Sequence, residues 1–296
     1  MELKTEDINV HLLATSDETQ ATGIELSHRS SAITVISDKA PTKPENIRLA
    51  LLKLVVKLLD KKHPPDSTPC FFPFDEVTTV SPNSIHKGTI RRLVWHFKEK
   101  CWNYYIKVDN KNISKRYYDT DLQRICEPTQ VFSIDTTPGL SHVNLPSTIS
   151  DNEPIQICIN GKPVLELITF IEEAFTELEY YYRTSEGEVD SPEEPIGVDP
   201  GSYGLPLVRH LNEGKLLGPI ENLLVVEDDD PDKGLKVIFD CDCGNEGCWP
   251  LCIRIEENSD HITWQHFHQI HRPEWHYPIG PYTFKKSEYF NRLRQK

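Results

Sequence analysis

Four cysteines lie within twelve residues of this chain, in the run CDCGNEGCWPLC: Cys241, Cys243, Cys248 and Cys252. Thiols this close in sequence are close in space in any fold, so they hold a metal, form disulfides or pack as reduced side chains. Gly244 and Gly247 allow the backbone to turn sharply between the second and third cysteine. The spacing therefore predicts that the first three sulfurs converge from two strand ends, as they do in a zinc knuckle.

A structural zinc needs a fourth ligand. Cys252 is nearest, but it alternates with Leu251 and Ile253 and so points away from their face of the strand. The other candidates are four histidines of the run ITWQHFHQIHRPEWHY: His266, His268, His271 and His276. Two alternatives stay open. The cysteines could be small buried packing residues, and the histidines could belong to an aromatic seam whose ring nitrogens bond to the backbone.

The composition indicates the cellular compartment, and therefore the redox environment, in which these thiols would lie. The chain is 38% hydrophobic and 26% charged, and it has no apolar run long enough to cross a bilayer. Its start, MELKTEDINV, lacks the basic and apolar regions of a signal peptide. We therefore expect a cytoplasmic protein that does not associate with membranes. In the cytoplasm thiols are kept reduced, which favours a metal over disulfides.

Charge is distributed unevenly along the chain, whose net charge is −14. Residues 166–240 carry 19 Asp and Glu against 5 Lys and Arg, whereas residues 86–118 carry nine Lys and Arg against Glu99 and Asp109. The basic segment is also rich in aromatic rings. Its candidate partner-binding residues are Arg91, Arg92, Trp95, Lys98, Lys100, Trp102, Tyr104, Lys107 and Arg116.

Basic side chains around exposed rings are typical of surfaces that bind single-stranded nucleic acid or a proline-rich peptide. In the alternative interpretation, every second ring belongs to the core of a small barrel and the lysines cover its outside. In this second interpretation the lysines face the acidic residues of 166–240, whose negative charge balances theirs.

Hydrophobic periodicity predicts an α+β protein of two domains. Residues 1–44 are polar and predict a weakly ordered arm. Residues 45–62 have apolar positions three and four apart and predict a helix, followed to residue 126 by short strands that suggest a small SH3-like β-barrel. The helix is more apolar than one buried face requires, so it could also form a homo-oligomer. Residues 127–154 are rich in Pro, Ser and Thr and predict a linker.

Residues 155–296 predict an α+β domain with a mostly antiparallel sheet and a hairpin clamped by the cysteines. A first strand at 155–159 is followed by a helix that starts near Pro163. Further strands are expected at 223–226, 235–239, 251–256 and 261–264, and a last helix at 287–293.

This second domain resembles a widespread bacterial family of uncharacterised proteins. The resemblance covers residues 155–293 and rests on a C-x-C-G-x-x-G-C segment, a V-x-W-x-x-F segment and a G-P-x-x-F-x-x-x-x-Y tail. Here these residues are Cys241, Cys243, Gly244, Gly247, Cys248, then Ile262, Trp264, Phe267, then Gly280, Pro281, Phe284 and Tyr289. Ile262 stands where the pattern has Val. The resemblance implies a domain of bacterial origin and no activity.

Two shorter resemblances point to parts of the chain. Residues 86–126 are similar to SH3-like modules, and residues 241–248 look like the post-SET zinc loop of histone methyltransferases, although the motifs of the SET domain are missing. The chain also has no P-loop, GxGxxG, GxSxG or HExxH motif.

Together these features predict a non-enzymatic cytoplasmic interaction or adaptor protein of bacterial origin. The first alternative is a nucleic-acid-associated protein that acts through residues 86–118. The second is a metal-dependent enzyme that uses the Cys/His region, which would need an open coordination site and a general base.

Overall fold

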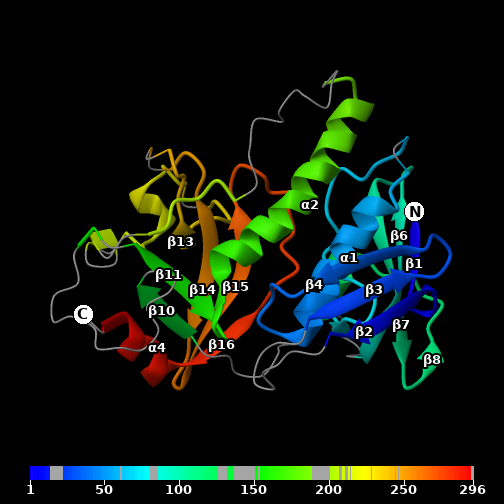
Figure 1. The fold of residues 1–296 in the computed structure, drawn as a ribbon, viewed down its shortest axis with the longest axis horizontal. Helices are drawn as coiled ribbons and strands as arrows, with labels where there is room; N and C mark the ends of the chain where they lie inside the picture. Colours follow the sequence, from blue (N-terminus) through cyan, green and yellow to red (C-terminus); the bar gives the residue numbers. More distant parts are fainter. Residues whose placement is uncertain are drawn as a thin grey trace. The chain divides into compact units, whose positions relative to one another are not determined.

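A computed structural model of the 296 residues shows the fold (Figure 1). It describes residues 1–13, 23–60, 62–80, 86–125, 132–136, 151–152, 154–188, 201–206, 209–210, 213, 215–227, 229–243, 245 and 247–294. The chain divides into two compact units. Unit 1 comprises residues 1–126 and 170–200, and unit 2 comprises residues 127–169 and 201–296.

The N-terminal segment of unit 1 forms an antiparallel meander and not a weakly ordered arm. Its strands are β2 (Ile8–Leu12), β3 (Ile24–His28) and β4 (Ile33–Ser37), each paired with the next. Ile24, Leu26 and Val35 lie on one face and are buried. The short apolar clusters of this polar segment thus alternate with a period of two, and a helix covers the face that they form.

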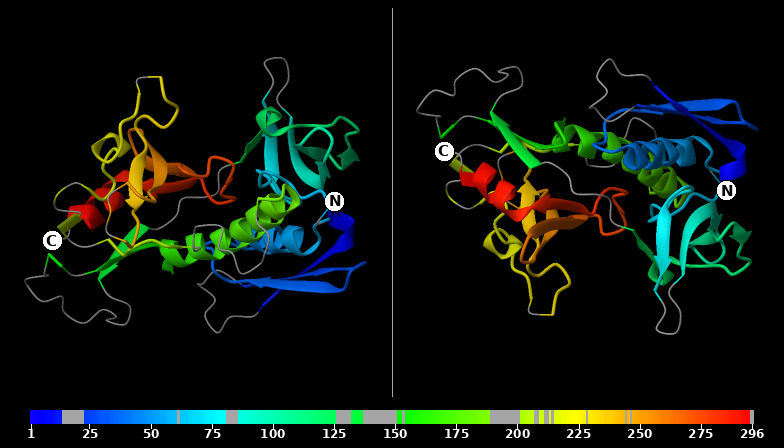
Figure 2. Two further views of the ribbon diagram at one scale, coloured as in Figure 1. Left: turned by 90° about the horizontal axis from the view of Figure 1, so that it is seen from above. Right: turned by 90° about the horizontal axis from the view of Figure 1, so that it is seen from below.

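That helix is α1 (Lys43–Lys57), which contacts β3 and β4 (Figure 2). Thr42 caps its N-terminus: the Glu45 amide donates to Thr42 Oγ1 at 3.4 Å, and the Thr42 hydroxyl donates to the Glu45 carboxylate at 3.0 Å. Its apolar residues from Leu49 to Val56 are buried within unit 1. The apolar stripe on which homo-oligomerisation was predicted is buried at Leu51, Leu54 and Val55 and half-buried at Leu58 and Leu59, and homo-oligomerisation stays a prediction.

The second sheet of unit 1 is antiparallel and carries the basic segment. Its strands run in the order β8-β7-β6-β5-β9, with β1 paired to β6. A 3-10 turn, η2 (Asp119–Asp121), precedes β9, and another, η1 (Thr5–Asp7), follows β1. The strand bounds are β1 Glu2–Lys4, β5 Glu76–Thr79, β6 Lys87–His96, β7 Cys101–Val108, β8 Lys111–Asn112 and β9 Leu122–Arg124. Within the described residues these strands do not close into a barrel.

A buried ion network lies beneath this sheet. Arg48 Nε donates to Asp75 Oδ1 at 2.8 Å, and Arg124 Nη2 lies 3.5 Å from Asp75 Oδ2. The side chains of Arg48 and Asp75 are almost fully buried. Because a buried charge is stable only when it is paired, this network ties α1 to the segments that flank β5 and β9.

Helix α2 (Val164–Ser185) begins in unit 2 and ends in unit 1 (Figure 1). In unit 2 it follows a small antiparallel sheet of the order β10-β11-β12. The bounds of these strands are β10 Phe132–Thr136, β11 Ile155–Ile159 and β12 Lys162–Pro163. β10 lies inside the segment that was predicted to be a linker. Most of the remaining residues of 127–154 lie outside the described part of the chain.

The main sheet of unit 2 is an antiparallel meander of the order β13-β14-β15-β16, followed by helix α4 (Lys286–Arg294). The strands are β13 Lys236–Phe239, β14 Leu251–Glu257, β15 His261–Gln269 and β16 Tyr282–Lys285. Residues 223–226 are not a strand, because they follow the 3-10 turn η3 (Ile220–Asn222) and the apolar side chains there pack onto a cluster that contains Ile220.

An aromatic core joins β10 to the main sheet of unit 2. The Phe132 ring lies 5.2 Å from Trp264, 5.5 Å from Phe284 and 4.7 Å from Tyr289, measured between ring centroids. The Trp264 indole donates to Tyr289 Oη at 3.1 Å, so the polar groups of these buried rings are paired.

Candidate functional site

The cysteine loop, residues 240–250, connects β13 to β14 in unit 2. Residues 201–204 run beside its first half. Tyr203 and Cys241 form an antiparallel bridge, the Gly204 amide donates to the Asp240 carbonyl at 3.1 Å, and the Asp242 amide donates to the Ser202 carbonyl at 3.2 Å. The start of the cysteine loop is thus held by backbone hydrogen bonds on both sides.

Asp240 closes the cysteine loop from within. Its Oδ1 accepts the amide of Cys241 at 2.8 Å, and its Oδ2 accepts the amide of Gly247 at 3.3 Å. Gly247 has φ +75°, and a Cβ there would lie 2.9 Å from the Leu224 side chain. Only glycine fits both the backbone conformation and the space. The Asp240 carboxylate thus holds the backbone of Cys241 close to that of Gly247, the residue before Cys248.

Three sulfurs converge in this loop. The Sγ atoms of Cys241, Cys243 and Cys248 all lie within 4.8 Å of one another. Sulfurs about 2.3 Å from a tetrahedral zinc lie about 3.8 Å apart, so the three positions fit one zinc ion with small side-chain movements. Cys243 and Cys248 are exposed and Cys241 is half-buried, which leaves the loop open to a metal from solvent.

The three thiols do not share one electrostatic environment. Burial raises the pKa of Cys241 to about 12. The pKa of Cys243 is lowered, first because the Cys241 thiol bonds to it and then because the Asn245 amide donates to its sulfur at 3.4 Å. A thiolate is the metal-binding form of cysteine, so Cys243 is the sulfur at which a metal meets the least competition from protons.

Cys252, the fourth predicted ligand, lies outside this group. It is fully buried in an apolar cluster with Ile220, Leu235 and Val237, and burial raises its pKa to about 12. It does point away from the face of Leu251 and Ile253, as its alternation predicts, but η3 and β13 cover that second face. In this arrangement Cys252 is a packing residue and not a ligand.

The four candidate histidines are also outside the group of three sulfurs. His268 Nε2 lies 3.3 Å from Asp232 Oδ1, and the His266 and His268 rings stack with centroids 5.1 Å apart. His271 stacks on Trp249 and its Nε2 lies 3.3 Å from the Gly247 carbonyl oxygen, beside the cysteine loop. His276 has interactions of its own with its surroundings. A fourth ligand from this set stays a prediction.

The basic segment separates into core rings and surface cations. Trp95, Trp102 and Tyr104 are buried, and the Trp102 indole donates to the Ser67 carbonyl at 3.0 Å. The candidate cations lie on the surface of the sheet or on its edges. Arg91 and Arg92 lie over the Tyr105 ring, Arg116 pairs with Glu99, and Lys98, Lys100 and Lys107 are exposed. The buried rings cannot stack on a nucleic acid base.

Two features of the cysteine loop escaped the sequence reasoning. These are the carboxylate of Asp240, which follows the predicted strand 235–239, and residues 201–204, which the sequence patterns do not connect to the cysteines. Gly201 has φ +67°, and a Cβ there would lie 2.1 Å from Thr169 Oγ1, which is a signal that only the tertiary structure reveals.

No protein-family model, curated protein or solved structure matches this chain. Every helix of the described residues is too short or too polar to cross a bilayer. The family resemblance of residues 155–293 therefore stays an expectation from its motifs.

Proposed function

We propose that this chain is a non-enzymatic interaction protein of the bacterial cytoplasm, in which a zinc ion held by Cys241, Cys243 and Cys248 stabilises unit 2. The convergence of three sulfurs on one loop is the observation that carries the proposal. Zinc would act here as a cross-link between the end of β13 and the start of β14. The described residues supply three thiolate ligands, so the fourth zinc ligand would be a water molecule or a further side chain.

Metal analysis of the full chain tests the zinc site. Protein purified with a reductant and without chelator should contain about one equivalent of zinc, with zinc–sulfur distances of about 2.3 Å in X-ray absorption. Cys243→Ser should lose the metal. Cys101→Ser is the matched control, because Cys101 is a half-exposed thiol at the start of β7 and should not affect zinc content.

Cobalt substitution gives a second readout that does not depend on how well a variant survives purification. The wild-type protein loaded with cobalt should show the thiolate-to-metal absorption of a tetrahedral site. Absence of both zinc and this absorption, with the thiols of Cys241, Cys243 and Cys248 freely alkylated in the native protein, would show that they are free thiols that hold no metal.

The turn between β6 and β7, residues 96–100, supports the interaction role. Phe97 is 48% exposed, and Lys98 and Lys100 on the same turn are exposed as well. Glu99, the acidic residue of this turn, is paired with Arg116 at 3.1 Å. An exposed ring on the same turn as two exposed cations favours an acidic peptide that carries an apolar side chain.

This turn also distinguishes a peptide from a nucleic acid. Binding to the full chain can be measured by fluorescence anisotropy with a labelled acidic peptide that contains tryptophan and with a labelled oligothymidylate of the same length. We expect the peptide to bind. Lys98→Glu combined with Lys100→Glu should weaken it by about tenfold or more, since both changes place like charges together. Lys111→Glu, on the exposed β7–β8 turn, is the matched control.

Preferential binding of the oligothymidylate, lost in the same double variant, would instead establish the nucleic-acid alternative. Equal binding of both probes by the wild type and the double variant would show that the turn is not a binding surface.

The strand order of unit 1 supports an SH3-like arrangement of residues 68–126. A meander of β5 to β8 is followed by the 3-10 turn η2 and a last strand, β9, that returns to pair with the first, β5. We propose that this half-open sheet is the interaction module and that unit 2 is the domain that the zinc stabilises.

A further inference from the structure

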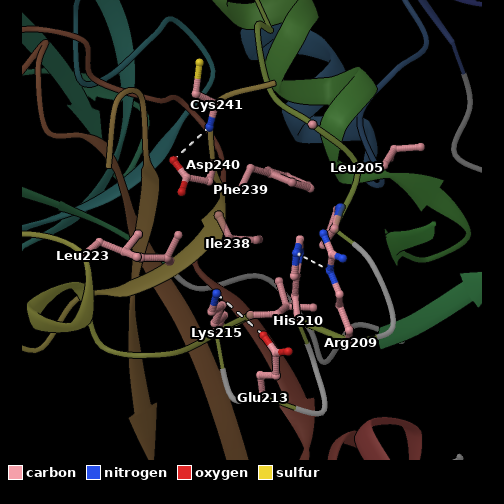
Figure 3. Close-up of a pocket in the computed structure, with 14 residues that line it drawn as sticks. Leu205, Arg209, His210, Glu213, Lys215, Leu223, Ile238, Phe239, Asp240 and Cys241 are labelled. Carbon is pink, nitrogen blue, oxygen red and sulfur yellow. Dashed lines mark hydrogen bonds and ion pairs between the residues drawn. The ribbon is translucent and has the colours of Figure 1, made fainter. Parts of the chain in front are cut away.

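A cavity of about 450 Å³ lies in unit 2 beside β13 (Figure 3). Its walls come from residues 204–206, from residues 209–216 where they are described, and from the strand itself. This volume is within the range of pockets that bind small organic molecules. Its position at the outer strand of the sheet gives it direct access to solvent.

The cavity exists because the outer edge of β13 is covered at two separate points. At one point the Leu217 amide donates to the Val237 carbonyl at 2.8 Å, and the Val237 amide donates to the Gly218 carbonyl at 2.9 Å. At the other point Gly204 bonds to Asp240. Ile238 and Phe239 lie between these two points and line the cavity.

The inner part of the cavity is apolar. Leu216, Ile238 and Phe239 are all buried, with exposed fractions of 8%, 0% and 2%. Leu205 and Leu223 line opposite sides (Figure 3). An apolar ligand group placed here would leave water for a surface that is already organised, which is favourable by about 25 cal/mol per Å² of buried apolar area.

The rim of the cavity has one cation, Arg209, that has no acidic side-chain partner among the described residues, although the charges that line the cavity balance. Glu213 lies 3.6 Å from Lys215, so these two charges offset each other. Both carboxylate oxygens of Asp240 accept backbone amides. Arg209 is exposed, and its side-chain partners among the described residues are neutral acceptors: His210 Nε2 at 3.4 Å and Asn152 Oδ1 at 3.3 Å.

We propose that this cavity binds a small organic anion with an apolar body. The carboxylate or phosphate of the ligand would meet the Arg209 guanidinium, whose planar set of donors matches such groups in two parallel hydrogen bonds. The apolar body would lie against Leu205 and Leu223, which line the cavity and are half-buried. Cys241, one of the three candidate zinc ligands, also lines the cavity. The contacts proposed here involve the Arg209 guanidinium and apolar side chains, so the proposal does not require zinc.

Calorimetry and ligand-observed NMR on the full chain test this proposal. The probes are 4-phenylbutyrate, phenyl phosphate and the uncharged 4-phenylbutanol. We expect saturable binding of one or both anions, at least tenfold tighter than the alcohol, and the preferred anion identifies the headgroup as a carboxylate or a phosphate. Arg209→Gln should weaken the anion at least tenfold, and Arg209→Lys should recover part of the loss.

Arg292→Gln, an exposed arginine of α4 away from the cavity, is the matched control and should leave binding unchanged. Failure of both anions to saturate the wild-type protein, or binding of the alcohol as tightly as the anions, would overturn the proposal. So would an Arg209→Gln variant that binds the anion like the wild type. The comparison of the three probes on the wild type keeps its meaning even if a variant folds poorly.

Discussion

Gly201 directly precedes residues 202–204, whose backbone bonds to the cysteine loop. It has φ +67°, and an added Cβ would meet Thr169 Oγ1 at 2.1 Å. Thr169 cannot easily move away, because its hydroxyl donates to the Leu165 carbonyl at 2.9 Å within α2. Backbone conformation and space therefore both require glycine at this position.

We predict that Gly201→Ala lowers the free energy of unfolding of unit 2 by about 1–3 kcal/mol more than a matched substitution does, because a tightly packed neighbour must shift. The matched substitution is Gly161→Ala, which also lies in unit 2. Gly161 has φ +72°, and a Cβ there would have nothing within 4 Å, so it reports the cost of the backbone conformation alone. Urea denaturation of both variants gives the comparison. Equal losses would mean that residues 201–204 adapt without strain.

Among the elements, β10 changes the organisation expected for the chain. It lies in a segment whose Pro, Ser and Thr content predicts a linker, yet it pairs with β11 along its whole length. Phe132 is 4% exposed and contacts three rings of the main sheet and α4. A strand that contributes an aromatic anchor belongs to the domain, whatever the composition around it.

We predict that Phe132→Ala destabilises unit 2 by about 3–5 kcal/mol, the usual cost of removing a buried aromatic ring. Tryptophan fluorescence during urea denaturation should report the loss, because Trp264 is in direct contact with Phe132. Phe97→Ala is the control, since Phe97 is 48% exposed and should change stability by less than about 0.5 kcal/mol. Similar small effects of both changes would mean that β10 belongs to the linker and not to the core of unit 2.

At the scale of the whole molecule, the two units carry different stabilising devices. Unit 1 contains the buried pair of Arg48 and Asp75, and unit 2 contains the three convergent sulfurs that are proposed to hold zinc. Because the proposed metal cross-links only β13 and β14, its removal should act on one unit and not on the other.

We predict that a chelator accelerates amide hydrogen exchange in residues 236–257 and leaves exchange in residues 87–108 unchanged. Removal of a structural metal loosens the segments that it joins. Mass spectrometry of peptides from the full chain measures both regions in one sample. Cys243→Ser should show the same pattern without chelator. A uniform increase over both regions would instead indicate that the whole chain responds to the metal.

Local patterns in the sequence were sufficient for several elements. The apolar positions of residues 45–62 predict α1, although the helix ends at Lys57. The strands β11, β13 and β14 lie close to their predicted ranges, and α2 begins next to Pro163, as predicted. The convergence of Cys241, Cys243 and Cys248 was also foreseeable, because glycine turns and short spacing leave these sulfurs few ways to separate.

Only the tertiary structure decided what covers each apolar face. A period of two shows that Cys252 and Leu251 point to opposite sides, but it cannot show that η3 buries the side of Cys252. For the same reason the sequence could not separate the buried Trp102 and Tyr104 from the exposed Phe97. Contacts between segments distant in sequence also form the N-terminal sheet and place β10 in unit 2. The same kind of contact joins residues 201–204 to the cysteine loop, and the hydrogen bonds of Asp240 then fix the conformation of that loop. Periodicity reports which residues avoid water, and packing between distant segments decides what they meet instead.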